Sequence, residues 1–260
     1  MIPKVLTIAG SDCSGGAGIQ ADVKTITVLG GYAMSVITAL TAQNTTGVRG
    51  VLPVPRDFVG QQMDCVFSDI VPDAVKVGMV SDRQIIEEIA EKLRQYGAKN
   101  VVVDPVMVST SGSRLLEDHA VESLISNLFP MAVLITPNIP EAEVLSGMRI
   151  SGKEDMEAAG KRILRETGAN VLIKSGHLPD CADDLLCMQG DVLWVSGEKI
   201  KNPNTHGTGC TLSSAIAVGL AGGKTIAESI WNAKGYLSRL LRQKFDLGKG
   251  SGPLWHNFRI

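Results

Sequence analysis

The chain has 260 residues, 44% of them hydrophobic and 20% charged, a length that suits one large domain with a substantial buried core. Its 25 basic and 27 acidic residues give a formal net charge of −2, which argues against a general binder of nucleic acids or anionic membranes. No apolar run approaches the roughly 18 residues of a membrane-spanning helix, and the N-terminus lacks the apolar core of a signal peptide. Five cysteines without a C-x-x-C pair predict reduced thiols in a cytoplasmic protein.

Short, β-branched-rich apolar segments alternate along the chain with longer amphipathic ones. The short segments predict buried parallel strands at 5–9, 34–42, 74–77, 101–104, 133–136 and 171–174. Three- and four-residue spacing of apolar side chains predicts helices over 82–96 and 225–241. Two further strands, at 184–188 and 192–195, predict an antiparallel hairpin. The alternation predicts a single α/β domain over 1–260, with a mostly parallel central sheet and helices on both faces.

Loops at the carboxyl ends of the strands are the expected place for a site, because open parallel sheets bind ligands there. The loops expected at that edge span residues 10–18, 41–47, 78–79, 104–112, 137–141, 175–177 and 205–211. His177 and His206 lie in these loops, and their isolation argues against metal ligation.

The sharpest motif is NTHGTGCT at 204–211, which precedes a small apolar helix expected over 212–220. Its two glycines let successive backbone N–H groups point the same way, and the helix start adds unpaired donors. Such donors bind anions and serve phosphoryl transfer, so the motif predicts a phosphate site. Cys210 lies at the helix entrance, where the pKa of a thiol tends to fall. A tight turn with a buried structural cysteine is the alternative.

Two other glycine-rich segments match nucleotide-binding motifs poorly. Residues 10–18 lack the G-x-G-x-x-G spacing, and no acidic residue follows about 20 positions later, as a nicotinamide dinucleotide site requires. Residues 221–225 end like a Walker A loop, but Val218 replaces the first glycine and the segment lies between two helices. We therefore reject both assignments.

Polar residues at the ends of predicted strands are candidates for binding cations and phosphates. Asp104 and Glu141 offer the carboxylate oxygens that Mg²⁺ prefers beside substrate phosphates. The alternative is that Asp104 caps a turn and Glu141 begins a helix, where acidic residues are favoured. Lys174 ends a buried strand and needs a partner there, either a phosphate or a structural salt bridge.

Gln43 also ends an apolar strand. Its carboxamide presents a donor and an acceptor side by side, which matches a ligand edge with a ring nitrogen next to an amino group. A glutamine that caps a turn is the alternative, and the residues alone leave both open.

Eight stretches, distributed over essentially the whole chain, together resemble one family. They are AGSDCSGGAGIQADVKT (9–25), TALTAQNT (38–45), VKVGMV (75–80), VVVDPVMVSTSG (101–112), TPNIPEAE (136–143), IKSGH (173–177), THGTGCTLSSAIA (205–217) and GSGPLWHNF (250–258). The sequence is similar to the hydroxymethylpyrimidine/phosphomethylpyrimidine kinases of thiamine biosynthesis, in the ribokinase-like superfamily. The resemblance implies a three-layer αβα fold and the phosphorylation of a small-molecule hydroxyl with ATP and Mg²⁺.

The resemblance also implies a homodimer that converts 4-amino-5-hydroxymethyl-2-methylpyrimidine to its monophosphate and then to its diphosphate. The pyrimidine pocket would be formed by Gln43, Gly10, Ala17, Asp22, Met79 and Val106. The ATP side would be formed by Asn138, Lys174 and Thr205, and Mg²⁺ would be bound by Asp104 and Glu141. The catalytic anion hole would be formed by Gly207, Thr208, Gly209 and Cys210.

Cys210 stands where many relatives in the wider superfamily have an Asp that acts as a base. We hypothesise that a thiol, smaller and less permanently charged, admits an already phosphorylated substrate. Cys13 and Ser175 depart from the family pattern, which usually has Ser or Pro and Gly at these positions, and they leave substrate breadth open. A pyridoxine or pyridoxal kinase on the same scaffold is the nearest alternative function. A non-catalytic ligand sensor is the alternative of another class, disfavoured because it would not need the phosphate-binding residues.

Overall fold

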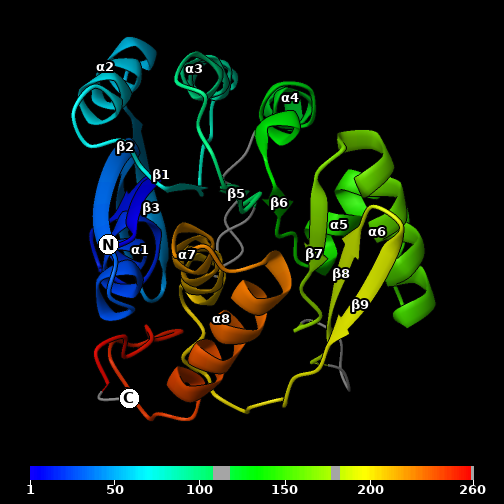
Figure 1. The fold of residues 1–260 in the computed structure, drawn as a ribbon. Helices are drawn as coiled ribbons and strands as arrows, with labels where there is room; N and C mark the ends of the chain where they lie inside the picture. The colour runs from blue at the N-terminus through cyan, green and yellow to red at the C-terminus, as the bar shows by residue number, and fades with distance from the viewer. Residues whose placement is uncertain (108–117, 177–181, 259–260) are drawn as a thin grey trace.

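The computed structural model of the protein describes residues 1–107, 118–176 and 182–258. These residues form a nine-stranded sheet in the order β3-β2-β1-β4-β5-β6-β7-β8-β9 (Figure 1). The strands are β1 (Lys4–Asp12), β2 (Tyr32–Asn44), β3 (Gly47–Pro53), β4 (Ala74–Val77), β5 (Val101–Val103), β6 (Leu134–Ile135), β7 (Asn170–Ile173), β8 (Asp184–Met188) and β9 (Asp191–Val195).

Strand directions define the edge of the sheet where a site can form. The neighbours from β2 through β1, β4, β5 and β6 to β7 all run parallel, whereas β3, β8 and β9 are joined by antiparallel pairing. The mostly parallel sheet and the late hairpin are therefore confirmed. The edge strand β3 has no counterpart among the predicted strands, because its side chains are largely exposed and form no buried apolar run.

Helices cover both faces of the sheet, which confirms the predicted three layers (Figure 1). One face packs against α2 through α6, and the other packs against α1, α7 and α8. The helices are α1 (Gly18–Val28), α2 (Arg56–Phe67), α3 (Arg83–Gln95), α4 (Asp118–Ser123), α5 (Ile139–Ser146), α6 (Lys153–Thr167), α7 (Thr208–Ala221) and α8 (Ile226–Leu241), with a π-helical turn at Leu124–Leu128 and a 3-10 turn at Phe129–Met131. In the described ranges, none of them combines the length and the apolar character needed to cross a membrane.

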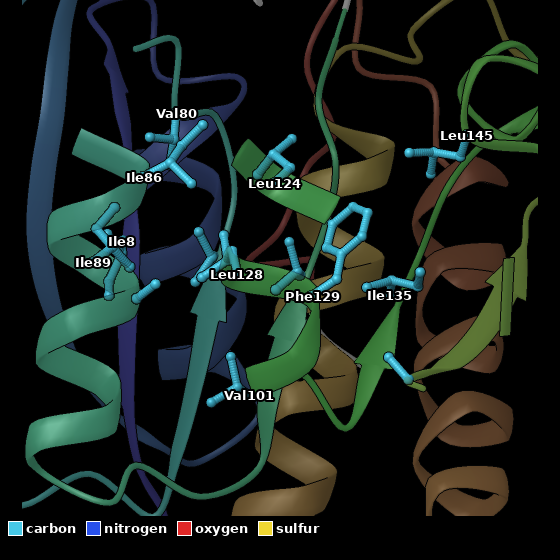
Figure 2. Close-up of a cluster of buried hydrophobic side chains, with 14 of the residues drawn as sticks. Ile8, Val80, Ile86, Ile89, Val101, Leu124, Leu128, Phe129, Ile135 and Leu145 are labelled. Carbon is cyan, nitrogen blue, oxygen red and sulfur yellow. The ribbon is translucent and has the colours of Figure 1, made fainter. Parts of the chain in front are cut away.

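The strands are apolar on both sides because each face of the sheet has its own core. Val101 and Val103 of β5 belong to the cluster formed with α3 and the π-helical turn, whereas Val102 belongs to the cluster formed with α7 and α8. Figure 2 shows side chains of the first cluster, including Ile89 of α3 and Leu128 of the π-helical turn. A parallel strand between two helical layers requires this continuous apolar character rather than alternation.

Local caps set the points at which the predicted helices begin. The Asp82 carboxylate accepts hydrogen bonds from the backbone N–H groups of Gln84 and Ile85, so α3 begins one residue after its predicted start. Thr225 and Glu228 form a capping box at the start of α8. Because the parallel strands end at one edge of the sheet, the loops that follow them gather there.

Candidate active site

The motif at 204–211 forms the turn into α7. Gly207 is the N-cap residue and has a φ of 86°, a left-handed conformation that favours glycine. A side chain at this position would also collide with the backbone carbonyl of Gly16. Since α7 begins at Thr208 rather than at the predicted residue 212, the second half of the motif, residues 208–211, forms the first helical turn.

The first turn of α7 offers backbone N–H donors. The N–H of Thr208 donates to the Thr205 carbonyl at 3.2 Å, whereas the described residues supply no acceptor for the N–H groups of Gly209 and Cys210. The helix start adds a partial positive charge. Two unpaired donors at a helix N-terminus are the chemistry that the predicted anion hole requires.

Asp104 and Lys174 approach this turn from the ends of β5 and β7. Lys174 Nζ lies 2.8 Å from Asp104 Oδ1, and 16% of the lysine side chain is exposed against 3% of the aspartate side chain. A Cβ on Gly209 would lie 3.2 Å from Asp104 Oδ2 and 3.5 Å from Lys174 Nζ, so the pair borders the helix start. Burial alone would raise the pKa of Asp104, but the ammonium groups of Lys174 and Lys76 lower it. The salt bridge named as the structural alternative for Lys174 is therefore present. An ammonium group has three N–H donors, so Lys174 can bind Asp104 and still donate to a phosphate.

Glu141 forms a capping box with Asn138 at the start of α5. Glu141 N donates to Asn138 Oδ1 at 2.9 Å, and Asn138 N donates to Glu141 Oε2 at 2.8 Å. The second carboxylate oxygen, Oε1, has a long contact of 3.5 Å from the Met107 N–H. Burial raises the pKa of Glu141 to about 7; the Asp104 carboxylate adds to the rise and Lys174 opposes it. Glu141 therefore does begin a helix, as the alternative for this residue predicts. Its Oε1 has only the long contact with Met107.

The donors at this edge can be tested for their fit to Mg²⁺. The described part of the chain holds no group of three or more His, Cys, Asp or Glu side chains suited to a metal ion. Mg²⁺ does not need one, since it keeps several waters and uses one or two carboxylates together with substrate phosphates. The Asp104 carboxylate is close enough to Glu141 to raise the pKa of Glu141. These residues therefore fit an ion shared with a nucleotide.

The predicted ligand-binding amide lies beside the phosphate turn. Gln43 is half-buried on β2, and its side-chain amide is 3.1 Å from Nε2 of His206, the residue before Gly207. His206 Nε2 in turn lies 2.8 Å from Asp12 Oδ2 at the end of β1. The side-chain amide of Gln43 therefore lies close to the N-terminus of α7. His177, the other histidine in a predicted loop, lies outside the described residues.

The other predicted pocket residues lie near the same edge of the sheet. Gly10 and Met79 are neighbours, since a Cβ on Gly10 would lie 3.1 Å from the Met79 sulfur. Ala17 is the N-cap residue of α1. The N–H of Val106 donates to the Asp104 carbonyl at 2.8 Å, which turns the chain at the end of β5. Contact of these residues with a ligand stays a prediction.

Asp22 has a different environment, a buried ion pair that the sequence analysis missed. Lys76 Nζ lies 3.0 and 2.8 Å from the two carboxylate oxygens, and both side chains are fully buried. The hydroxyls of Thr7 and Ser214 donate to the same carboxylate at 2.6 and 2.7 Å. A carboxylate accepts about four hydrogen bonds, so these partners occupy it and leave the predicted pocket-lining role of Asp22 without a free oxygen. The sequence feature that could have revealed this ion pair is Lys76, a lysine inside an otherwise apolar strand.

Comparison with known proteins identifies the family to which the chain belongs. A family model described as phosphomethylpyrimidine kinase matches residues 12–255. The chain belongs to this family. It is 49% identical over 258 residues to the hydroxymethylpyrimidine/phosphomethylpyrimidine kinase of Rhizobium meliloti, covering 98% of this chain and 97% of that protein. It is also 52% identical to the thiamine biosynthesis bifunctional protein ThiED of Geobacter sulfurreducens, and the match covers 97% of this chain and 52% of that longer protein.

Solved structures agree with the family assignment. The phosphomethylpyrimidine kinase of Clostridium difficile 630 is 48% identical, with a TM-score of 0.83 over 92% of this chain and 100% of that one. Pyridoxal kinase of Bacillus subtilis, solved as an ADP complex, is 37% identical, with a TM-score of 0.91 over 98% of each chain. The predicted ribokinase-like fold and the assignment as a kinase are confirmed.

In this kinase the expectation of a lowered thiol pKa is wrong. Burial raises the pKa of Cys210 to about 11; Lys76 opposes the rise, whereas the Asp22 and Asp104 carboxylates add to it. The helix start therefore does not decide the ionisation of this thiol, because desolvation of the charged form outweighs it. At neutral pH Cys210 is an uncharged thiol.

Asp12 is a further residue at the site of the kinase, and it is absent from the predicted site residues. It ends β1 as a buried carboxylate, and its Oδ2 accepts from the N–H groups of Gly16 and Ala17 at 3.1 and 2.9 Å. An acidic residue between an apolar strand and a glycine-rich loop was the available signal. Its contact with His206, 194 positions along the chain, carried no local signal.

Proposed function

We propose that this kinase transfers phosphate from ATP to the hydroxymethyl group of 4-amino-5-hydroxymethyl-2-methylpyrimidine, and then a second phosphate to the product. The observation that carries the proposal is the contact of Gln43 with His206, which precedes the phosphate turn. An amide suited to an aminopyrimidine edge and a pair of unpaired N–H donors thereby meet at one sheet edge. The names of the relatives at 48–49% identity support the same substrate class.

The residues divide naturally between the two substrates. Gln43 holds the pyrimidine, and the N–H groups of Gly209 and Cys210 receive the phosphoryl group in transfer, with Gly207 and Thr208 shaping the turn. Lys174 stabilises negative charge on the phosphates, and Asn138 and Thr205 border the nucleotide. Phosphoryl transfer relies on positioning and charge stabilisation more than on covalent chemistry by the protein. Thr205 N and Oγ1 lie 3.3 Å from Ser251 Oγ, which ties the turn to the C-terminal segment.

Asp104 and Glu141 would hold Mg²⁺ on the phosphates, where the ion neutralises charge that develops during transfer. Asp104 is already oriented by Lys174 and by the Thr136 hydroxyl, which donates to Oδ1 at 3.1 Å. The buried Glu141 gains a reason to ionise when a cation is bound beside it. The protonated Cys210 does not act as a base, and its neutrality lowers the repulsion that an already phosphorylated substrate would meet.

A coupled assay of ADP release tests the proposal. The pyrimidine alcohol, its monophosphate and pyridoxal are supplied separately with ATP and Mg²⁺, and each product is identified by mass spectrometry. We expect turnover of the alcohol and of its monophosphate. A higher kcat/KM for pyridoxal would make vitamin B6 phosphorylation the main activity, and absence of turnover on every alcohol would favour a ligand sensor.

Phosphorylation of pyridoxal is the second candidate activity. It is supported by the likeness to the pyridoxal kinases of Bacillus subtilis and Staphylococcus aureus, at 37% and 34–35% identity with TM-scores of 0.88–0.91. Pyridoxal is also a substituted heteroaromatic alcohol, but it lacks the ring nitrogen beside an amino group that Gln43 matches. We therefore expect it to be the poorer substrate.

A homodimer in the cytoplasm completes the proposal. Leu40 and Leu52 are paired in register on β2 and β3, and they are 47% and 65% exposed at the edge of the sheet. Phe58 of α2 adds a third exposed apolar side chain, 55% exposed. An apolar edge strand favours association, and a second copy would cover it. Light scattering coupled to size exclusion should give twice the chain mass, and Leu52→Asp should shift it toward the monomer; a wild-type monomer would contradict the dimer.

A further inference from the structure

The contact with the Asp12 carboxylate decides which ring nitrogen of His206 bears a hydrogen. Asp12 Oδ1 accepts from the Ser14 N–H and hydroxyl, both at 2.8 Å, and Oδ2 accepts from two backbone N–H groups and lies 2.8 Å from His206 Nε2. Burial alone would raise the pKa of Asp12, but these hydrogen bonds lower it to about 2. An ionised carboxylate only accepts hydrogen bonds. Nε2 of His206 therefore carries a hydrogen.

The orientation of the Gln43 amide follows from that hydrogen. The terminal atom of Gln43 nearest to His206 Nε2 is its own Nε2, at 3.1 Å, which would set two N–H donors against each other. A half-turn about the last side-chain bond leaves the shape of a carboxamide unchanged and exchanges its oxygen with its nitrogen. With the carbonyl oxygen on this side, the one hydrogen on His206 Nε2 is shared between Asp12 Oδ2 at 2.8 Å and the Gln43 oxygen at 3.1 Å, and the conflict disappears.

Thr41 gives a second, independent reason for the same half-turn. Its hydroxyl donates its one hydrogen to the Ser11 carbonyl at 2.9 Å. Gln43 Oε1 lies 3.4 Å from this hydroxyl oxygen, which would set two acceptors against each other. With the amide nitrogen on this side instead, Gln43 donates weakly to Thr41. One rotation thus resolves both mismatches.

We infer that His206 and Thr41 fix the Gln43 carboxamide with its oxygen toward the phosphate turn and its nitrogen toward Thr41, and thereby determine which way round the pyrimidine binds. The inference rests on the proposed function for the identity of the ligand. Both are positioning residues, because they act on the substrate through Gln43. The carbonyl accepts two hydrogen bonds and the amino group donates two, so one position of each remains for a ligand.

The fixed order of donor and acceptor has a consequence for the reacting group. The 4-amino group of the substrate must face the Gln43 oxygen on the His206 side, and the adjacent ring nitrogen must face the amide nitrogen on the Thr41 side. The hydroxymethyl group is attached to the ring carbon beyond the amino-bearing one. It therefore extends past His206 toward Gly207 and the unpaired N–H groups of α7. The opposite orientation of the amide would turn the hydroxyl away from the phosphate turn.

A pair of substrates separates orientation from general damage. The 4-oxo analogue of the pyrimidine presents an N–H and a carbonyl in the reverse order, so it opposes the fixed amide at both contacts. We expect wild-type kcat/KM to favour the amino substrate over the oxo analogue by on the order of 100-fold, as two mismatched hydrogen bonds imply. His206→Phe, which frees the amide to rotate, should reduce this ratio at least about tenfold, chiefly through KM.

Matched variants control for structural loss. His206→Gln keeps an N–H donor near the Nε2 position and should restore most of the discrimination. Thr41→Val removes the second partner at nearly equal volume and should also lower the ratio, whereas Thr41→Ser should not. A merely structural role would lower kcat/KM for both substrates and leave the ratio unchanged. If His206→Phe does not fold, the Thr41 pair carries the same test.

The position of the hydrogen on the His206 ring gives a readout that does not depend on activity. Imidazole ¹⁵N–¹H correlation spectra of the intact ligand-free protein, with His206→Gln used to assign the signal, should show hydrogen on Nε2. A ring nitrogen Nε2 without hydrogen overturns the inference whatever the activity. Turnover of the pyrimidine with an unchanged ratio in both His206→Phe and Thr41→Val also overturns it, while the proposed function stands. Hydrogen on Nε2 without pyrimidine turnover supports the orientation of Gln43 and refutes the proposed function.

Discussion

Two lysine–aspartate pairs of the same 2.8 Å length occupy very different places in the molecule. The pair Lys76–Asp22 is wholly buried between β4 and α1, and two hydroxyls complete the carboxylate. The pair Lys174–Asp104 lies at the ends of β7 and β5, with 16% of the lysine side chain exposed and a second carboxylate, Glu141, close by. Lys76–Asp22 is therefore a closed pair, with no group available to a ligand. Lys174–Asp104 is an open pair: the Lys174 ammonium can bind phosphates, and Glu141 is an excess carboxylate that can bind a cation.

Breaking the closed pair should have the largest effect, and on stability. Lys76→Met leaves the Asp22 carboxylate buried without its counter-charge, which typically costs about 3–5 kcal/mol of unfolding free energy. The shift should appear as a lower midpoint in urea denaturation. Lys76→Met combined with Asp22→Asn should recover much of the loss, because no unpaired charge remains. Equal instability of the single and the double variant would show that packing, not charge, makes this pair important.

Breaking the open pair should affect turnover more than stability. Lys174→Met removes a charge that faces the proposed phosphate position, and loss of one such stabilising donor typically lowers kcat by about 10²–10³-fold. Asp104 keeps the Thr136 hydroxyl and the nearby Lys76 ammonium, so the loss of unfolding free energy should be smaller than for Lys76→Met. Steady-state kinetics and urea denaturation of the same preparation measure both. A larger loss of stability than of turnover would reverse the comparison.

The sequence shows the difference between the two pairs only in part. Lys76 inside an apolar strand and Lys174 at the end of one are both visible, as is the limit of β4 at Ala74–Val77, which matches its prediction. Their partners are not visible, because Asp22 is 54 positions from Lys76 and Asp104 is 70 positions from Lys174. Apolar periodicity identifies buried strands and the edge where they end. It does not say which charges meet after folding.

Ionisation was the least predictable property of the site. A thiol at a helix start was expected to have a lowered pKa, but burial raises the pKa of Cys210 to about 11. Desolvation depends on the atoms that folding brings around a group, and the charged groups that act on Cys210, which are Lys76, Asp22 and Asp104, come from distant segments. The edge strand β3 escapes prediction for another reason, since Arg49 and Gly50 interrupt its apolar residues and most of the strand is exposed. The ligand contacts proposed for the site residues stay predictions.

The excess carboxylate of the open pair should make stability depend on pH. Burial raises the pKa of Glu141 from 4.5 to about 7, so the folded protein retains a proton that the unfolded chain releases. Its stabilising contribution is complete below pH 4.5 and is lost as the pH rises to about 7. Between pH 5 and pH 8, without Mg²⁺, wild type should lose about 2 kcal/mol of unfolding free energy relative to Glu141→Gln.

Glu141→Gln is a matched reference for this measurement, because Gln also completes a capping box with Asn138. Parallel pH profiles of the two proteins would mean that Glu141 is ionised throughout the range. Lys76→Met should leave the pH difference in place, since the closed pair has no excess carboxylate.

The smallest expected effect concerns the thiol that borders both pairs. The Cys210 thiol interacts electrostatically with Lys76 of the closed pair and with Asp104 of the open one, and it adds no charge at neutral pH. Cys210→Asp introduces a negative charge at the helix start, where the monophosphate brings negative charges of its own. We expect the second phosphorylation to fall roughly fivefold more than the first, because about 1 kcal/mol of added repulsion applies to the charged substrate. Separate kcat/KM values for the alcohol and the monophosphate measure the ratio, and Cys210→Ser is the uncharged control. Equal loss of both kcat/KM values in Cys210→Asp, with neither value changed in Cys210→Ser, would contradict this prediction. The charge at position 210 would then not distinguish the two phosphorylation steps, and another part of the site would have to admit the phosphorylated substrate.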